Sequence, residues 1–210
     1  MKRFIRLLMV AFVVILGIYV TYENKKMEKI QQGIADKIIR FHVRANSDSE
    51  KDQNIKTRVK ENVVDYLYDR LSASESLDET KQILTDNMDE IKEIAVETVR
   101  DSGENYDVNV YFEEAYFPLR TYGDMSFPPG VYEAFRIDIG DYEGKNWWCV
   151  LYPPLCFVDS TYAVVPDASK QQFKEILSPE EYCAVTVGTL SKSKVKFEFK
   201  YFKFLNRLMP

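Results

Sequence analysis

The spacing of apolar residues changes about halfway along this chain. Between residues 50 and 99 apolar side chains recur every three or four positions, as in Ile55, Val59 and Val63. Between residues 106 and 152 they recur at every second position. A period near 3.6 indicates amphipathic helices, and a period of two indicates strands. Because helices and strands occupy separate stretches, the sequence predicts an α+β fold.

We expect a two-layer domain in which one strand precedes two amphipathic helices, and a mainly antiparallel set of strands follows. The expected elements, in chain order, are a strand at 38–43, helices at 50–71 and 77–99, and strands at 106–117, 131–139 and 146–152. A short helix should begin at Ser178 and Pro179, since proline suits the first turn. Residues 194–201 alternate again, which predicts either an added strand or a segment at a membrane surface.

The first expected strand alternates polar with apolar residues. Arg40, His42 and Arg44 fall on one face, which we expect to be wet, and His42 should lie at the surface or in an interface. His42 is the single histidine, and the three cysteines match no common zinc-ligand spacing. The residues therefore predict no metal site.

The amino end has the layout of an export signal. Lys2, Arg3 and Arg6 precede residues 7–20, which contain no charged side chain. Residues 1–22 are read as a signal peptide or an uncleaved signal anchor, and the anchor is favoured because no pair of small residues suited to cleavage follows. Positive residues on the amino side keep that end cytoplasmic, so the remainder should lie outside. Residues 23–36 are polar and are expected to form a spacer that is either a short helix or flexible.

Charge is distributed unevenly along the chain. The formal net charge is −5, which argues against a protein that coats nucleic acid. Residues 191–210 are nevertheless rich in lysine and aromatic residues, so the chain between the two ends is more acidic than the total suggests. The composition predicts an exported globular domain with a C-terminal extension, 161–210, that ends in a basic and aromatic tail.

Two stretches are more specific than any periodicity. They are IIRFHVRANSDSEKDQNIKTRVKENV at residues 38–63 and FPLRTYGDMSFPPGVYEAFRIDIGDYEGKNWWCVLYPPLCFVD at residues 117–159. Together they resemble the stage II sporulation protein R family of endospore-forming Firmicutes, and residues 37–160 form the domain that carries the resemblance. The resemblance implies a sporulation signal that is made in the forespore and exported into the space between the forespore and mother-cell membranes.

The resemblance also implies a partner and excludes several others. Family members activate a membrane-embedded aspartic protease, which removes the pro-sequence of the sporulation factor sigma-E. We therefore expect no enzyme activity, no cofactor, no small-molecule substrate and no nucleic acid as partner. The alternatives are an exported hydrolase that uses loop carboxylates such as Asp124 or Glu133, and a tethered structural domain of the envelope.

Five residues are candidates for partner binding. Arg120, Tyr122 and Asp124 lie in an expected loop, although Asp124 could simply close a turn and Arg120 could pair with it. Trp147 and Trp148 are adjacent on a strand, so their side chains should point to opposite faces. An outward-facing tryptophan is a favoured interface anchor. By contrast, Asn46-Ser47-Asp48-Ser49 is expected to cap the following helix.

Cys149 and Cys156 are seven positions apart. An extended chain would hold them more than about 20 Å apart, far beyond disulfide reach, but Pro153-Pro154 between them could reverse the chain. Since export permits oxidation, a disulfide is favoured over two buried thiols, and Cys183 should be unpaired. We expect no catalytic cysteine, because no histidine or basic cluster adjoins either position.

Overall fold

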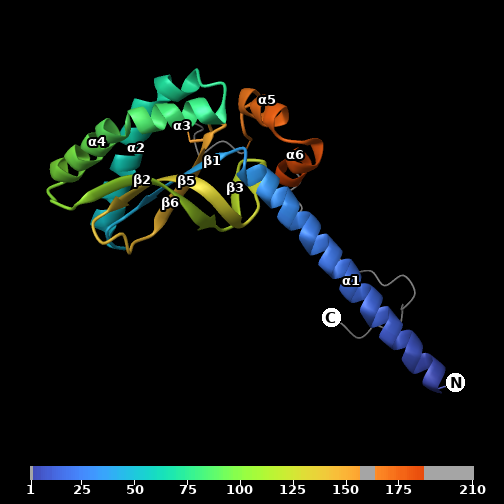
Figure 1. The fold of residues 1–210 in the computed structure, drawn as a ribbon. Helices are drawn as coiled ribbons and strands as arrows, with labels where there is room; N and C mark the ends of the chain where they lie inside the picture. The colour runs from blue at the N-terminus through green and yellow to red at the C-terminus, as the bar shows by residue number, and fades with distance from the viewer. Residues whose placement is uncertain (1, 157–163, 187–210) are drawn as a thin grey trace.

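The computed structural model describes residues 2–156 and 164–186 (Figure 1). Its elements, in chain order, are α1 (Lys2–Ala35), β1 (Ile39–Arg44), α2 (Glu50–Ser72), α3 (Leu77–Asp86), α4 (Met88–Asp101), β2 (Val108–Phe117), β3 (Arg120–Tyr122), β4 (Met125–Phe127), β5 (Gly130–Ile139), β6 (Asn146–Tyr152), α5 (Asp167–Ile176) and α6 (Pro179–Thr186). The α+β class is as predicted, and so is a short helix beginning at Pro179. The alternating segment at 194–201 lies outside the described residues.

The main sheet is mixed, with four strands in the order β2-β5-β1-β6. Strand β1 runs parallel to β5 and antiparallel to β6, while β2 and β5 are antiparallel. The expected antiparallel set is therefore interrupted, because the first strand of the domain inserts between two later ones. This insertion leaves β1 with neighbours on both edges.

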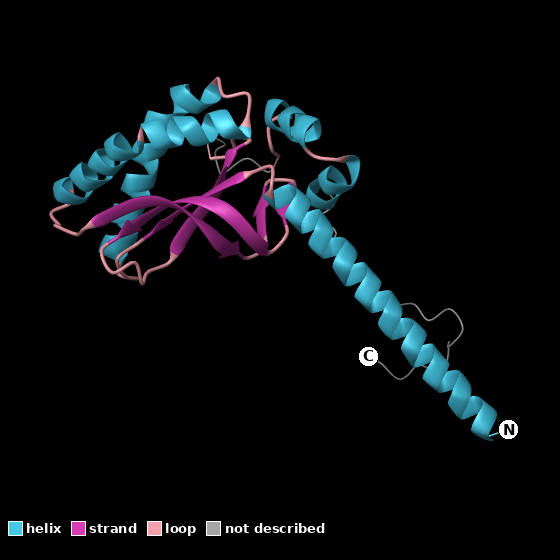
Figure 2. Ribbon diagram, viewed as in Figure 1, coloured by secondary structure: helices cyan, strands magenta, loops and turns pink. Residues whose placement is uncertain are grey.

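Helices α2, α3 and α4 cover one side of the sheet (Figure 2). Their apolar stripes pack on side chains of the strands in one buried cluster, which includes Val59, Leu67, Leu84, Ile91, Phe41 and Phe135. The helix expected at 50–71 is confirmed by α2. The single helix expected at 77–99 is wrong, because the chain breaks at Asn87 into α3 and α4. The Asn87 amide accepts a hydrogen bond from Tyr66 of α2, which ties the break to the neighbouring helix.

A second buried cluster lies on the opposite side of the sheet, at one end of the strands. It joins the carboxyl end of α1, the β3–β4 hairpin and helices α5 and α6 to side chains of β5 and β6. Ile34 and Ile38 are fully buried there. Of the two forms expected for residues 23–36, the structure has the helical one, because α1 continues without a break to Ala35. Within the described residues no helix is long and apolar enough to cross a membrane, and the signal anchor at 1–22 stays a prediction.

The segment Asn46-Ser47-Asp48-Ser49 caps α2, as predicted. The Ser49 hydroxyl accepts a hydrogen bond from the backbone N–H of Asp52 at 3.1 Å. The Asp52 carboxylate in turn accepts hydrogen bonds from Asn46 and Ser47. A side chain that accepts from the first turn satisfies a backbone donor that the helix itself leaves free. These polar residues therefore have a structural role at the strand-to-helix junction.

Candidate functional site: an open face of the sheet

Half of the sheet face opposite helices α2–α4 is polar. On this face Arg40, His42 and Arg44 of β1 lie in register with Ala134, Arg136 and Asp138 of β5, and with Val150, Trp148 and Asn146 of β6. The second buried cluster extends along the face to Ala134 and Val150, and Trp148 packs against its edge. Beyond it, the described helices lie on the other side of the sheet (Figure 2). We call this half the open face; its residues are His42, Arg44, Tyr111, Glu113, Arg120, Arg136, Asp138, Asn146 and Trp148.

Several side chains of the open face form a hydrogen-bonded cluster. Arg136 donates to Glu113 at 2.6 Å and to Asp138 at 2.7 Å. Tyr111 donates its hydroxyl to the other oxygen of Asp138 at 2.8 Å, and Nε2 of His42 lies 3.3 Å from Glu113. Both carboxylates of the cluster are therefore already bound by one guanidinium.

His42 is buried, contrary to the expectation of a surface or interface residue. Only 3% of its surface is exposed, because β1 has neighbours on both edges and the ring stacks on Trp148. Burial, and then the charge of Arg136, lower the pKa of His42 to about 4 against the opposing effect of Glu113. The imidazole is therefore neutral at pH 7, and because Nε2 faces a carboxylate, we place its proton there.

The hydroxyl of Tyr111 is also held in one protonation state. Burial, followed by the hydrogen bond to Asp138, raises the pKa of Tyr111 to about 12. Burial lowers the pKa of Arg136, but the hydrogen bonds to Asp138 and Glu113 outweigh this and raise it. Tyr111 is therefore neutral and Arg136 charged near neutral pH.

Arg120 and Trp148, two of the five candidate residues, lie together on the open face. The Arg120 guanidinium is 5.2 Å from the Trp148 ring centroid. The other side of the indole is fixed, because Trp148 stacks on His42 at 4.9 Å and packs edge-on against Phe117 at 4.7 Å. Such packing holds the tryptophan in one orientation and leaves it partly exposed.

Trp147 points to the other side of the sheet, as the alternation predicts. It packs edge-on against Phe41 at 5.8 Å, and the Lys60 ammonium of α2 lies 5.4 Å from its ring. Trp147 therefore belongs to the interface between sheet and helices, and it does not join Trp148 in a common surface.

Tyr122 and Asp124 belong to a hairpin that replaces the expected loop. Strands β3 and β4 pair across a turn at Gly123, whose φ of +54° suits glycine. Asp124 accepts a hydrogen bond from the backbone of Val165 at 2.9 Å and pairs with Lys170 at 2.6 Å. It therefore ties the hairpin to the segment before α5, and its ion-pair partner is Lys170 instead of Arg120, the alternative that the sequence left open.

Arg40 was not singled out from the sequence, because its polar type suggested a wet position. It is fully buried, and its guanidinium lies 4.5 to 5.8 Å from the ring centroids of Phe117, Tyr122, Phe127 and Tyr132. Its one hydrogen bond to another side chain among the described residues goes to the Tyr122 hydroxyl at 3.2 Å. Burial lowers the pKa of Arg40. No signal in the alternating pattern distinguishes such an enclosed arginine from an exposed one.

Cys149 and Cys156 are joined by a disulfide, with Cα atoms 5.3 Å apart. The chain reverses after β6, where the backbone N–H groups of Leu155 and Cys156 both donate to the Val150 carbonyl. This reversal brings the two cysteines together across Pro153 and Pro154. Cys183 is free and exposed on α6.

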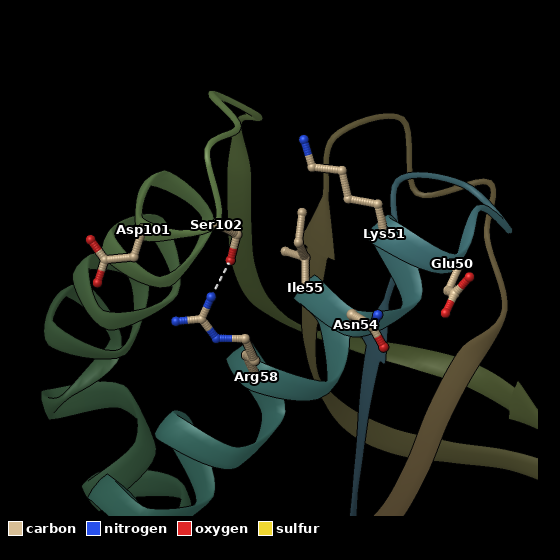
Figure 3. A pocket seen from close by; sticks show the side chains of 7 residues that line it. All are labelled: Glu50, Lys51, Asn54, Ile55, Arg58, Asp101 and Ser102. Atoms are coloured by element: carbon tan, nitrogen blue, oxygen red, sulfur yellow. Dashed lines mark hydrogen bonds between the residues drawn. The ribbon is translucent and has the colours of Figure 1, made fainter.

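One cavity lined by described residues is of another kind. It has a volume of about 690 Å³ and lies between the start of α2 and the end of α4 (Figure 3). Its walls are mainly exposed polar side chains such as Glu50, Lys51 and Asp101, and Arg58 donates to Ser102 across it at 2.8 Å. No group of three or more potential metal ligands occurs within the described residues. We therefore take the open face as the candidate site.

Comparison with known proteins agrees with the resemblance in the sequence. The family model described as stage II sporulation protein R (spore_II_R) matches residues 35–162, which is more than half of the chain. This chain belongs to the stage II sporulation protein R family. It is 36% identical over 159 residues to the stage II sporulation protein R of Bacillus subtilis (strain 168), and the alignment covers 73% of this chain and 71% of that protein. No solved structure matches the chain. Membership of the family assigns the chain a role in sporulation.

Proposed function

We propose that this chain is an exported signalling protein of the forespore that activates the membrane-embedded aspartic protease on the mother-cell side. The activated protease then removes the pro-sequence of sigma-E. Membership of the stage II sporulation protein R family supports the sporulation role. The observation that carries the proposal is the open face, where Trp148 and Arg120 form a fixed and partly exposed pair.

An activator of this kind works by differential binding. It must bind the active arrangement of the protease more tightly than the inactive one, since a ligand with equal affinity for both states shifts nothing. Tryptophan and arginine dominate the binding energy of many interfaces. Because His42 stacks on the Trp148 ring and Phe117 packs edge-on against it, little side-chain entropy is left to lose on binding.

The hydrolase alternative gains no support from the positions of its carboxylates. Asp124 is paired with Lys170, and Glu133 is paired with Lys81 at 2.5 Å. No observation favours a purely structural domain of the envelope over a signal. The proposed partner is therefore a protein, reached outside the cytoplasm.

Export is part of the proposal and rests on the amino end. Apolar side chains such as Leu7, Phe12, Ile15 and Ile18 are exposed around the first half of α1. A large exposed apolar surface of this kind is a feature of segments that contact a membrane. A reporter enzyme that is active only in the cytoplasm, fused after Pro210, is therefore expected to stay silent. Strong reporter activity would contradict export.

The direct test is reconstitution in a host that does not sporulate. The full chain, the membrane protease and pro-sigma-E are expressed together, and processing of pro-sigma-E is followed by immunoblot. We expect processing only when all three are present. Processing that does not depend on the chain would refute the proposal.

Variants then test the open face. Trp148→Ala and Arg120→Ala should each weaken the complex by about 2 kcal/mol, roughly thirtyfold in affinity, and reduce processing. Tyr116→Ala is the matched control, because Tyr116 is an aromatic residue that is 64% exposed and belongs to the opposite face of β2. All variants must show an unchanged thermal midpoint. Normal signalling by folded Trp148→Ala and Arg120→Ala would remove the open face as the contact surface.

A further inference from the structure

The unpartnered polar atoms of the buried side chains gather on one side of the sheet. Among the described residues six such nitrogen or oxygen atoms have no hydrogen-bond partner, namely Nε and Nη1 of Arg40, Nδ1 of His42, Nε of Arg44, Nε of Arg120 and Oδ1 of Asn146. Buried polar atoms are normally satisfied, so each exception requires an explanation. Arg40, His42, Arg44 and Asn146 share one face by strand register, and Arg120 lies over Trp148 of that face.

Arg40 differs from Arg44 and Arg120 because its side chain is not accessible to solvent. Its guanidinium lies among four aromatic rings, and the residue has no exposed surface. A ligand cannot reach it without opening the β3–β4 hairpin. Arg44 and Arg120 are only half-buried, so the ends of their guanidinium groups face solvent while Nε is covered. These two arginines are therefore the donors available to a partner.

Neither accessible arginine has a carboxylate partner. Within the described residues, Arg44 and Arg120 form no salt bridge, while both carboxylates of the open face are bound by Arg136. Instead, each stacks on an aromatic ring: Arg44 lies 5.2 Å from the ring of Tyr142, and Arg120 lies 5.2 Å from that of Trp148. The open face thus carries unneutralised positive charge on a chain whose formal net charge is −5.

The two arginines are close enough for one short segment to reach both. Arg44 pairs with Asn146 across β1 and β6, two residues before Trp148. Diagonal neighbours of this kind are about 7–8 Å apart, and Arg120 covers the indole from the other side. Guanidinium groups bind carboxylates in a planar, often bidentate geometry, and stacking on an aromatic ring leaves their N–H edges free for this.

We propose that the open face docks an acidic segment of its protein partner, with carboxylates against Arg44 and Arg120 and apolar contact on Trp148. This inference rests on the proposed function, in which the partner is the part of the membrane protease that lies outside the cytoplasm. It adds the chemistry of recognition to that proposal. It also explains why two arginines stand without counter-ions on an acidic protein.

The first test measures affinity of the full chain for the purified protease in detergent. Arg44→Gln and Arg120→Gln should each lower affinity at least tenfold, because each removes a charge-assisted contact. Arg100→Gln is the matched control, since it removes the same charge from an exposed position on α4, away from the open face. An effect of Arg100→Gln as large as that of the other two would overturn the proposal, because it would indicate a response to net charge alone.

The second measurement starts from the unmodified chain. The affinity of the unmodified chain should fall as sodium chloride is raised from low to high concentration, because ions screen accessible charges. The Arg44→Gln/Arg120→Gln double variant should show a shallower dependence. An affinity of the unmodified chain that does not change with salt contradicts docking through these arginines.

A charge exchange identifies the partner segment. Arg44→Glu should abolish binding, and replacing one acidic residue of the protease by arginine should restore it at least tenfold. Failure of every acidic position to restore binding would overturn the inference. Two further results would also overturn the inference. In both, the Arg44 and Arg120 variants keep their affinity for the protease. In the first they lose self-association, measured by sedimentation, and in the second they lose binding to anionic vesicles.

The outcomes separate this inference from the proposed function. If the chain triggers processing and the arginine variants do so equally well, the acidic docking segment is refuted and the signalling role stands. If the chain neither binds the protease nor triggers processing, the proposed function fails first.

Discussion

His42 lies where a charged imidazole would be costly. Its ring is stacked on Trp148, and the positive Arg136 is a close neighbour, so burial and charge both favour the neutral form. In the unfolded chain the same side chain would titrate near its ordinary value of about 6.5. Folding therefore lowers the number of protons that His42 binds in mildly acidic solution. Stability must then depend on pH through this one residue.

We expect the free energy of unfolding to fall as pH is lowered from about 6.5 to about 4, by roughly 3 kcal/mol in total from His42. The contribution is fully present above pH 6.5, because both states are then neutral, and it is lost as the unfolded chain takes up its proton first. Urea unfolding between pH 7 and 5 should show a smaller dependence in His42→Gln. The single imidazole resonance in NMR should titrate near pH 4; titration near 6.5 would contradict this.

Arg40 is expected to be replaceable by an apolar residue. Its burial is offset only by aromatic rings and one hydroxyl, with no carboxylate within the described residues. Arg40→Met should therefore change the free energy of unfolding by less than about 1 kcal/mol. Arg40→Lys should lower it by about 2 kcal/mol, because an ammonium is more strongly hydrated and cannot stack. Urea unfolding measures both, and an Arg40→Met variant that is less stable than Arg40→Lys would refute this account.

The position of β1 within the sheet determined whether the polar residues of its alternating pattern are exposed or buried. Arg40, His42 and Arg44 alternate with apolar residues as in a strand that has one wet face. Because β1 inserts between β5 and β6, it has neighbours on both edges, and Arg40 and His42 are buried while Arg44 stays half-buried. The residues of β1 alone do not indicate that β5 and β6 will pair with its two edges. The burial of Arg40 and His42 therefore follows from pairing between distant segments.

Short elements were the hardest to predict. The break between α3 and α4 at Asn87 depends on a hydrogen bond from Tyr66 of α2, and the β3–β4 hairpin is held by contacts to the segment before α5. In each case a contact from elsewhere in the chain ends or stabilises the element. The apolar stripe at 77–99 was correctly identified, since both helices place it against the sheet.

The disulfide between Cys149 and Cys156 is expected in protein recovered from outside the cytoplasm. Mass spectrometry of peptides that have not been reduced should find the two linked and Cys183 free. Closing so short a loop should stabilise the fold by about 2–3 kcal/mol. The double variant Cys149→Ala/Cys156→Ala should lose about this much in urea unfolding, and Cys183→Ala is its control. Free thiols at both positions in exported protein would contradict the prediction.

Helix α1 connects two chemically different regions of the molecule. Its first half exposes apolar side chains, while Ile34 and Ala35 at its carboxyl end are buried against the domain (Figure 1). Lys37, just beyond the helix, pairs with Glu181 of α6 at 2.5 Å. If the amino end is held in a membrane, the domain is thus attached through a helix that runs directly into its core.

Truncation tests this division of α1. A chain that begins at residue 23 keeps all the buried contacts and should have the same thermal midpoint as the domain within the full chain. A chain that begins at residue 39 loses the buried Ile34 and Ile38, each worth about 1.5–3 kcal/mol, and should be less stable by at least about 3 kcal/mol. Circular dichroism melting measures both. Equal midpoints would show that the end of α1 does not support the fold.

Apolar periodicity and local polar motifs by themselves determined the α+β class, the main helices and strands, the cap of α2 and the opposite directions of Trp147 and Trp148. These features depend on neighbouring residues, and the backbone geometry translates their spacing directly into structure. Two long motifs likewise pointed to the family that the comparisons confirm. Only the tertiary structure decided that β1 lies inside the sheet, that Arg40 is enclosed, and that Arg120 meets Trp148 while Tyr122 and Asp124 do not. These depend on pairing between segments far apart in the chain, whose partners no local pattern specifies.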